Sequence, residues 1–171
     1  MNFLKQIKMK IAYLHGLESS VNPNSPKIKW LNSNFDQVYS PVIDYKQDNM
    51  FNDILEHIKR INPDYIVGSS MGGYFTYLIG SILGIETVLF NPAVIGRPFD
   101  PVVDLTGVEN KSKHNLFLGE NDNVIKGSEI IKFFKESDLA ESTVEYYKGE
   151  HRVPVDVFTA SIKKVSGIMD I

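Results

Sequence analysis

The strongest candidate for chemistry in this sequence is Ser70, in the pattern Gly68-x-Ser70-x-Gly72. A short apolar run, 65–67, precedes the pattern, and apolar residues at helical spacing follow it. These features predict a buried strand, a sharp turn with the serine at its apex, and a helix. Glycine suits both flanking positions because so tight a turn leaves no room for a Cβ atom. The pattern therefore predicts a raised serine hydroxyl that could act as a nucleophile.

Two further residues could assist a serine nucleophile. Asp122 follows a predicted strand at 115–118, and His151 follows another at 143–147. An imidazole, whose reference pKa is about 6.5, can accept a serine proton at neutral pH, and a carboxylate can hold the imidazole in the required tautomer. The carboxyl ends of parallel strands meet at one edge of a sheet, so these side chains are expected there together. Glu120 remains an alternative to Asp122 as the acid.

Attack on an acyl carbonyl also needs donors for the negative charge that develops on its oxygen. The backbone N–H of Met71, directly after the serine, is one candidate. The N–H of Leu17 is the second, because His15-Gly16-Leu17 follows the predicted first strand at 10–14. We expect His15 to be a hydrogen-bonding residue beside this loop. Met71 and Leu17 are thus the predicted oxyanion hole.

The elements that must position these residues alternate between strand and helix. Strands are predicted at 10–14, 37–41, 65–67, 87–90, 115–118 and 143–147. Helices are predicted at 27–32, at 51–61, directly after Gly72 and at 128–135. A last helix is predicted from one apolar face, which consists of Val155, Phe158, Ile162, Val165 and Met169. The segment 93–113 has no sustained period and is predicted to be a short cap. This order predicts an α/β fold over 1–171 as one domain, with about six mostly parallel strands and helices on both faces.

Composition narrows the classes of function. The chain has 171 residues, a formal net charge of −3 and no cysteine. The charge gives no electrostatic reason to expect nucleic acid or an anionic membrane as partner, and the lack of cysteine excludes a disulfide scaffold or thiolate site. The four histidines lack metal-ligand spacing, and neither GxGxxG nor GxxxxGK[ST] occurs. We therefore expect no metal and no cofactor.

The first ten residues alternate lysines with apolar side chains and show neither a signal-peptide core nor a cleavage site. No stretch of the chain is long and apolar enough to predict a membrane span. The expected location is cytoplasmic, and Met1 and Met9 are both candidate starts.

Several motifs together resemble one known family. They are Tyr13-Leu14-His15-Gly16-Leu17, Gly68-Ser69-Ser70-Met71-Gly72-Gly73, Asn91-Pro92-Ala93-Val94, Asn121-Asp122-Asn123-Val124 and Gly149-Glu150-His151. In content and order the chain resembles a minimal α/β-hydrolase, most of all the compact bacterial esterases of the YqiA type. The resemblance implies a triad of Ser70, Asp122 and His151 that hydrolyses esters or thioesters. Two departures, Leu17 in place of an aromatic residue and one glycine fewer before His151, affect the expected acyl pocket.

The leading hypothesis is a serine carboxylesterase acting on small-molecule esters with short- to medium-chain acyl groups. The substrate-binding residues are expected in the cap, in the loop after the first strand and beside the two catalytic loops: His15, Gly16, Tyr74, Val94, Ile95, Arg97, Phe99 and Val153. An acyl-CoA thioesterase with the same triad is the nearest alternative, and a non-catalytic binding protein of the same fold is the alternative from another class. The sequence does not indicate an oligomeric state.

Overall fold

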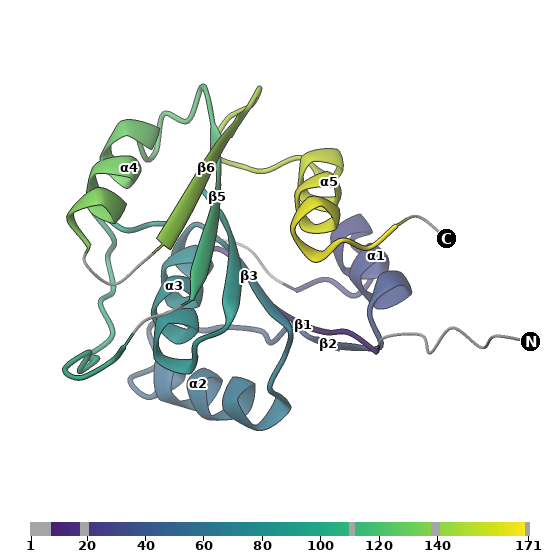
Figure 1. Ribbon diagram of the computed structural model, residues 1–171, viewed down its shortest axis with the longest axis horizontal. Helices are drawn as coiled ribbons and strands as arrows, with labels where there is room; N and C mark the ends of the chain where they lie inside the picture. Colours follow the sequence, from purple (N-terminus) through teal and green to yellow (C-terminus); the bar gives the residue numbers. More distant parts are fainter. Residues whose placement is uncertain (1–7, 18–20, 110–111, 138–140, 170–171) are drawn as a thin grey trace, which may run out of the picture.

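A single six-stranded parallel sheet organises the chain. The computed structural model describes residues 8–17, 21–109, 112–137 and 141–169 (Figure 1). Within them the strand order is β2-β1-β3-β4-β5-β6, and every neighbouring pair is parallel. The strands are β1 (Lys10–Leu14), β2 (Gln37–Tyr39), β3 (Tyr65–Ser69), β4 (Glu86–Phe90), β5 (Lys113–Gly119) and β6 (Glu141–Tyr147). The predicted α/β class with six parallel strands is confirmed.

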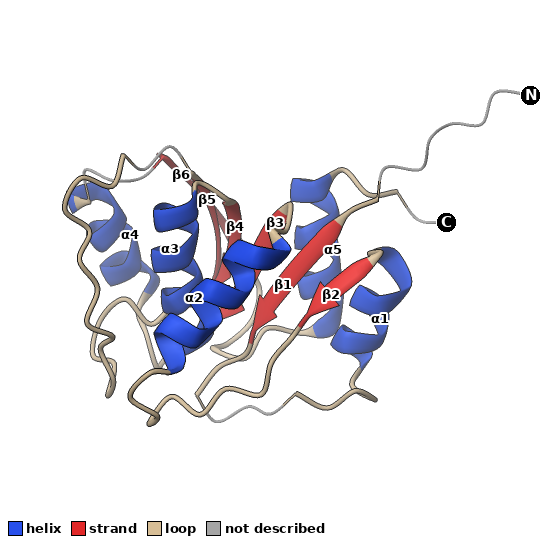
Figure 2. Cartoon of the chain, turned by 90° about the horizontal axis from the view of Figure 1, so that it is seen from below, coloured by secondary structure: helices blue, strands red, loops and turns tan. Residues whose placement is uncertain are grey.

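Helices cover both faces of this sheet. The helices are α1 (Pro26–Asn34), α2 (Met50–Ile61), α3 (Met71–Leu83), α4 (Gly127–Glu136) and α5 (Val155–Ser166). Helices α1 and α5 lie on one face, and α2, α3 and α4 lie on the other (Figures 1 and 2). Each face has its own buried core, because side chains of a strand alternate between the two faces. Ile66 and Leu89 belong to the α3 side, whereas Val67 and Phe90 belong to the α5 side.

Helix α3 lies against the middle of the sheet and is buried over nearly its whole length, from Met71 to Ser81. Gly80 permits this contact with β4, since a Cβ there would lie 2.4 Å from Cγ2 of Thr87. Helix α2 presents only one face to the protein and buries Phe51, Ile54 and Ile58. Helix α3, which begins directly after Ser70, is therefore surrounded by the core on almost every side.

Several expected boundaries were wrong, including the following three. The last helix ends at Ser166, where Gly167 adopts a left-handed φ of 71°, so Met169 lies beyond it and is 84% exposed. His114, expected before the fifth strand, lies inside β5 and is fully buried. The predicted strand at 37–41 ends at Tyr39. The last helix stops at the left-handed glycine although the apolar pattern continues, and β5 begins before its apolar run because His114 already pairs with Thr87 of β4.

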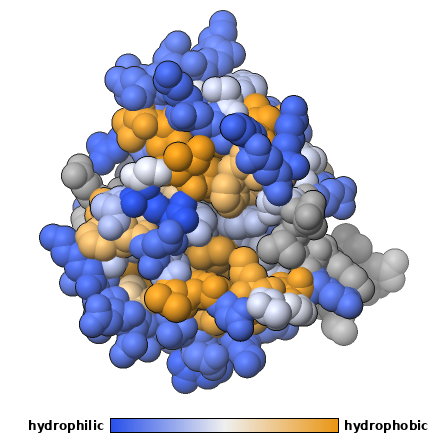
Figure 3. Space-filling view, turned by 90° about the vertical axis from the view of Figure 1, so that its left-hand side faces the viewer, coloured by the Kyte–Doolittle hydropathy of each residue, from blue (hydrophilic) through white to orange (hydrophobic). Residues whose placement is uncertain are grey.

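The segment between β4 and β5 corresponds to the predicted cap, and its described residues form no regular helix or strand. Residues 110–111 of this segment lie outside the described residues. The candidate start Met1 also lies outside them. Figure 3 faces the side that lies to the left in Figure 1 and shows apolar residues near the middle of that face with hydrophilic residues around them. Among the described residues, no helix has the length and apolarity needed to cross a membrane.

Candidate active site

Ser70 occupies the turn between β3 and α3 in a backbone conformation that few side chains adopt. Its φ is 53° and its ψ is −117°. Such a conformation costs on the order of 1–3 kcal/mol and persists only where neighbouring contacts enforce it. Here the Ser70 N–H donates to the Phe90 carbonyl at 3.0 Å, and the Ser70 carbonyl accepts from Ala93 at 2.8 Å and from Tyr74 at 3.1 Å. The end of β4 thus fixes this turn.

The two glycines of the pattern allow the turn to pack against its neighbours. A Cβ at position 72 would lie 2.1 Å from the carbonyl oxygen of Leu14, at the end of β1. A Cβ at position 68 would lie 2.3 Å from Oγ1 of Thr76 and 2.4 Å from the carbonyl of Gly72. Only glycine fits at either position, because the close atoms include backbone that cannot move away.

The serine, the histidine and the aspartate predicted from the sequence form a chain of hydrogen bonds. Nε2 of His151 lies 3.0 Å from Oγ of Ser70, and Nδ1 of His151 lies 2.7 Å from Oδ2 of Asp122. The carboxylate can only accept, so Nδ1 carries a proton and Nε2 of the neutral ring has a free lone pair toward the serine. This arrangement has the geometry of a nucleophile, a base and a group that orients the base.

Asp122, rather than Glu120, reaches the imidazole. The Asp122 side chain is 1% exposed. Its Oδ1 accepts from the backbone N–H groups of Val124 at 2.8 Å and Ile125 at 2.9 Å, which leaves Oδ2 for His151. Three donors therefore stabilise a buried carboxylate. The Glu120 side chain lies exposed at the surface.

Asn91, at the end of β4, ties the loops of the site together. Its φ is 43°, and its Nδ2 donates to the His151 carbonyl at 2.8 Å and to the Tyr147 hydroxyl at 2.7 Å. Its Oδ1 accepts from the Gly119 N–H at 2.8 Å. The Tyr147 hydroxyl in turn donates to the Glu150 carbonyl at 2.9 Å. Asn91 therefore holds the backbone of the histidine loop, a role that the sequence analysis missed.

Met71 and Leu17, the predicted oxyanion donors, line one pocket together with Ser70. Met71 is the first residue of α3, so its N–H has no carbonyl partner within that helix. His15 lies beneath the neighbouring loop and is 2% exposed. Its Nε2 accepts from the Ile43 N–H at 3.0 Å, so its Nδ1 donates to the Gly16 carbonyl at 2.7 Å. Burial lowers the pKa of His15, which keeps this ring neutral.

Two pockets meet at Ser70. The first, about 270 Å³, has a mainly apolar wall. Its lining is Leu17, Ser70, Met71, Ala93, Ile95, Gly96, Arg97, Pro98, Val124, Ile125 and Glu129. The second, about 490 Å³, contains both Ser70 and His151. Its lining is Tyr13, Gly16, Leu17, Lys27, Ser69, Ser70, Val124, His151, Arg152 and Val153. We call these the apolar pocket and the histidine pocket.

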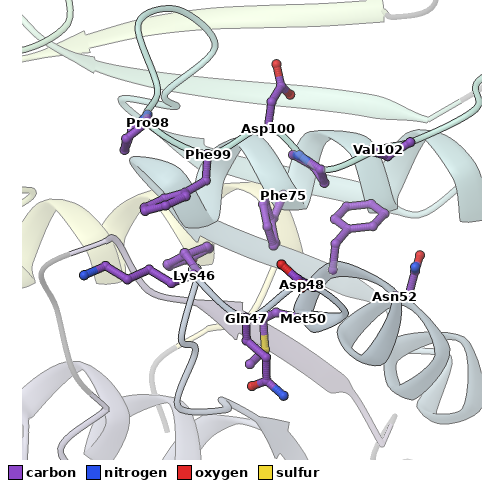
Figure 4. Close-up of a pocket in the computed structure, with 13 residues that line it drawn as sticks. Lys46, Gln47, Asp48, Met50, Asn52, Phe75, Pro98, Phe99, Asp100 and Val102 are labelled. Carbon is purple, nitrogen blue, oxygen red and sulfur yellow. The ribbon is translucent and has the colours of Figure 1, made fainter.

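The expected substrate-binding residues divide between different places. Ile95 and Arg97 line the apolar pocket, and Gly16 and Val153 line the histidine pocket. Tyr74, Val94, Phe99 and His15 are absent from both linings. Phe99 instead lines a hollow of about 500 Å³ between the segments 45–52 and 98–102 (Figure 4).

Tyr74 and Val94 accept hydrogen bonds from Arg97, although neither residue lines the apolar pocket or the histidine pocket. The Tyr74 hydroxyl accepts from Nη2 of Arg97 at 2.9 Å, and Nη1 of Arg97 donates to the Val94 carbonyl. The guanidinium also pairs with Asp100 at 2.8 Å and lies 3.7 Å from the centre of the Tyr74 ring. These contacts fix the direction of the arginine at the edge of the apolar pocket.

The structure also places residues at the site that the sequence pattern did not single out. Lys27, from α1, and Tyr13, from β1, line the histidine pocket. Lys27 carries no sequence signal, because it lies in an ordinary helix and reaches the site through the packing of α1 against the sheet. Tyr13 belongs to the sequence motif at the end of β1 but was not predicted to line the site. Within the described ranges, no three histidine or acidic side chains are grouped so that they could hold a metal ion.

Comparison with solved structures gives one fold. A hydrolase of the α/β superfamily from Xanthomonas campestris superimposes with a TM-score of 0.66 at 16% identity, covering 90% of this chain and 92% of that one. A monoacylglycerol lipase from Paleococcus ferrophilus gives 0.67 at 15%, covering 92% and 93%. The fluorophosphonate-binding serine hydrolase F of Staphylococcus aureus gives 0.61 at 19%, covering 96% and 85%. The chain therefore has the α/β-hydrolase fold.

Sequence comparison identifies the family. A search of curated proteins finds no match. The family model of UPF0227, described as an uncharacterised protein family, matches residues 10–141, which include β1 to β5 and the Ser70 turn. The resemblance to YqiA-type proteins within the α/β-hydrolase superfamily is thereby confirmed. This chain belongs to the UPF0227 family.

Proposed function

We propose that the protein is a serine carboxylesterase that hydrolyses small-molecule esters with short- to medium-chain acyl groups. The observation that carries the proposal is the continuous set of contacts from Ser70 Oγ to His151 Nε2, at 3.0 Å, and from His151 Nδ1 to Asp122 Oδ2, at 2.7 Å. The raised conformation of Ser70 at the end of β3 supports it. The names of the structural neighbours, which include a lipase and a serine hydrolase, agree with this class.

The residues would act in two half-reactions. As Ser70 Oγ bonds to the acyl carbon, its proton passes to His151 Nε2, and Asp122 stabilises the charged imidazole. Met71 and Leu17 N–H groups would hold the carbonyl oxygen as it becomes negative. His151 then gives the proton to the departing alcohol oxygen as its bond to the acyl carbon breaks. Water next attacks the acyl-enzyme, gives a proton to His151 and releases the acid, and the proton returns to Ser70.

The size and lining of the apolar pocket support the acyl preference. Its volume of about 270 Å³ is just below the 300–1,000 Å³ typical of pockets for larger ligands. Ala93, Ile95 and Ile125 supply apolar surface beside Ser70. A short acyl chain can bury its carbons there while its carbonyl stays at the serine.

A fluorophosphonate probe tests the nucleophile directly. We expect one label on the native protein and none on Ser70→Ala, because the probe bonds to an activated serine oxygen. Hydrolysis of p-nitrophenyl butyrate is expected to fall at least 10³-fold in the same variant, since the residual rate then depends on binding and the oxyanion donors alone. The nearby Ser69→Ala variant is the matched control and should still be labelled.

Two results would contradict the proposal. Labelling that persists in Ser70→Ala would place the reactive group elsewhere. A folded native protein that neither reacts with the probe nor hydrolyses any p-nitrophenyl ester from two to eight acyl carbons would favour a binding protein. Parallel assays with acyl-CoA thioesters of the same chain lengths separate the esterase from the thioesterase.

A further inference from the structure

The charges around Ser70 are distributed unevenly between its two pockets. The apolar pocket has one cation, Arg97, and one carboxylate, Glu129, in its lining. The histidine pocket has Lys27 and Arg152 and, among the described residues, no carboxylate in its lining. A neighbouring hollow of about 590 Å³ contains the same two cations, shares Tyr13 and Val153 with the histidine pocket, and likewise has no acidic residue in its described lining. The positive charge therefore extends outward from the serine on one side only.

Lys27 is held in place rather than free at the surface. Its Nζ donates to the Val153 carbonyl at 2.7 Å and lies 5.2 Å from the centre of the Phe158 ring. An ammonium group has three N–H donors, so the contact with Val153 leaves two for another acceptor. In the described part of the chain no ion pair involves Lys27 or Arg152. A fixed cation with spare donors beside the nucleophile is suited to an anionic partner.

Lys27 and Arg152 repel each other, because no described acidic residue shares their two pockets. Burial, with a smaller contribution from Arg152, lowers the pKa of Lys27 to about 8. A bound carboxylate or phosphate would remove this cost, because an opposite charge favours the charged form of the lysine. Helices α1 and α5 also begin at this hollow, at Pro26 and Val155. The partial positive charges of their N-termini add to the positive potential of Lys27 and Arg152.

The position of His151 indicates which part of the substrate meets these cations. The imidazole must reach the alcohol oxygen in order to protonate it. His151 lines the histidine pocket and is absent from the lining of the apolar pocket. The alcohol therefore leaves on the side of Lys27 and Arg152, whereas the acyl chain lies in the apolar pocket.

We infer that the preferred substrates are esters whose alcohol part carries a carboxylate or a phosphate, which Lys27 and Arg152 bind in the histidine pocket. This inference rests on the proposed esterase function and adds the class of leaving group to it. The chemistry of the reaction is unchanged: the bond between the acyl carbon and the alcohol oxygen breaks, and His151 supplies the proton to that oxygen.

Matched butyryl esters test the inference. O-butyryl glycolate is compared with the neutral O-butyryl glycolamide, and 1-butyryl-glycerol 3-phosphate is compared with 1-butyrylglycerol, by release of butyrate. We expect kcat/KM of the wild type to be about tenfold or more higher for each anionic ester, which corresponds to about 1.4 kcal/mol. The two pairs distinguish a carboxylate from a phosphate as the preferred group. Added salt should reduce the preference, because these charges are partly open to solvent.

Variants show whether the two cations cause the preference. We expect the ratio of anionic to neutral kcat/KM to fall toward one in Lys27→Gln and in Arg152→Gln, and Arg152→Glu to favour the neutral member of each pair. Lys27→Arg keeps the charge and should keep most of the preference, which separates loss of charge from loss of folding. Lys59→Gln removes an exposed lysine from α2, on the opposite face of the sheet, and should leave the ratio unchanged.

The outcomes separate this inference from the proposed function. If Ser70-dependent hydrolysis of neutral esters is found but the wild-type ratio is one or less, the anion site is refuted and the esterase stands. Binding of glycerol 3-phosphate, measured by calorimetry against glycerol, needs no turnover. Binding that is lost in Lys27→Gln would support the anion site even if hydrolysis fails, and equal weak binding of both compounds would refute it.

Discussion

Asp122 and Glu120 lie two residues apart after β5, and only one of them is built into the hydrogen-bond chain at Ser70. Asp122 is buried and accepts from Val124, Ile125 and His151, whereas the Glu120 side chain is exposed. A carboxylate in this position holds the imidazole in the tautomer that can accept the serine proton. The difference between the two acids comes from backbone donors that point at only one of them.

Substitution at both positions tests this difference. We expect Asp122→Asn to lower kcat for p-nitrophenyl butyrate by about 10³–10⁴-fold, because an amide can donate to the ring and stabilise the wrong tautomer. Glu120→Gln should stay within about twofold of the wild type. Circular dichroism checks that both variants fold. A large loss in Glu120→Gln with little change in Asp122→Asn would exchange the two roles.

At this scale the sequence predicted Asp122 as the acid, through its resemblance to a known family, and kept Glu120 as the alternative. Ser70 and His151 each had a distinctive neighbourhood, and the structure brings them within 3.0 Å. The choice between Asp122 and Glu120 depends on how the turn at 119–125 folds, and no local pattern encodes it. Lys27 carried no signal because its place at the histidine pocket arises from the packing of α1 against the sheet.

At the scale of elements, the Ser70 turn depends on a close contact between α3 and β1. Gly72 lies in the first turn of α3, and a Cβ on it would lie 2.1 Å from the Leu14 carbonyl and 2.4 Å from the His15 carbonyl. Neither backbone oxygen can move without disturbing β1 or the loop that supplies Leu17. A larger residue must therefore push α3 away from the sheet.

Gly72→Ala is expected to reduce both stability and activity. We expect a loss of about 3 kcal/mol in the free energy of unfolding, the upper end of the range typical of overpacking in a core, because the atoms in the way are backbone. Urea denaturation measures this loss. Gly84→Ala is the matched control, because Gly84 has a φ of 69° and open space around it. The control should cost about 1–2 kcal/mol for the left-handed backbone of an alanine and leave activity unchanged. Equal losses in both variants would refute the steric explanation.

The elements themselves were largely predictable, because their apolar patterns are local. Strand β1 and helix α2 were predicted almost to the residue, since the strand is a short apolar run and the helix ends at Asn62-Pro63. The predicted last helix is too long, because Met169 continues the apolar period beyond Ser166, where α5 ends. Gly167 was the available signal, since glycine commonly ends a helix in the left-handed conformation.

At the scale of the whole molecule, a buried histidine couples folding to pH. His114 lies in β5, is fully buried and contacts Oγ1 of Thr87 at 2.7 Å. Burial lowers the pKa of His114 to about 4. An unfolded histidine has a pKa of about 6.5, so between these values the unfolded chain binds a proton that the native protein does not. Protonation therefore favours unfolding across this range.

The contribution of His114 to the free energy of unfolding should accordingly be fully present above about pH 6.5 and be lost as the pH falls toward 4. The contribution of His114 is about 3 kcal/mol at its largest, at 1.36 kcal/mol for each unit of pKa shift. Urea denaturation at pH 7 and pH 4.5 measures it, and His114→Gln should show a smaller difference between the two. His15, whose pKa burial also lowers, supplies part of the remaining slope. An unchanged difference in His114→Gln would contradict the assignment.

Strand order is the property of the whole molecule that local patterns could not give. The arrangement β2-β1-β3-β4-β5-β6 depends on pairing between strands far apart in sequence, such as β1 with β3. Asn91 illustrates the consequence, because its side chain joins β4 to the last residues of β5 and β6 and to the loop after β6. Its importance could not be predicted before these strands were known to be neighbours.

The contact between Ser70 and His151 joins residues that are far apart in the order of synthesis. Ser70 is translated before His151, whose imidazole contacts its hydroxyl and follows 81 residues later. The backbone contacts that fix the Ser70 turn come from Phe90 and Ala93, which precede His151 in the chain. A chain that ends before His151 would hold the Ser70 turn without its proposed base, so we expect it to show no ester hydrolysis.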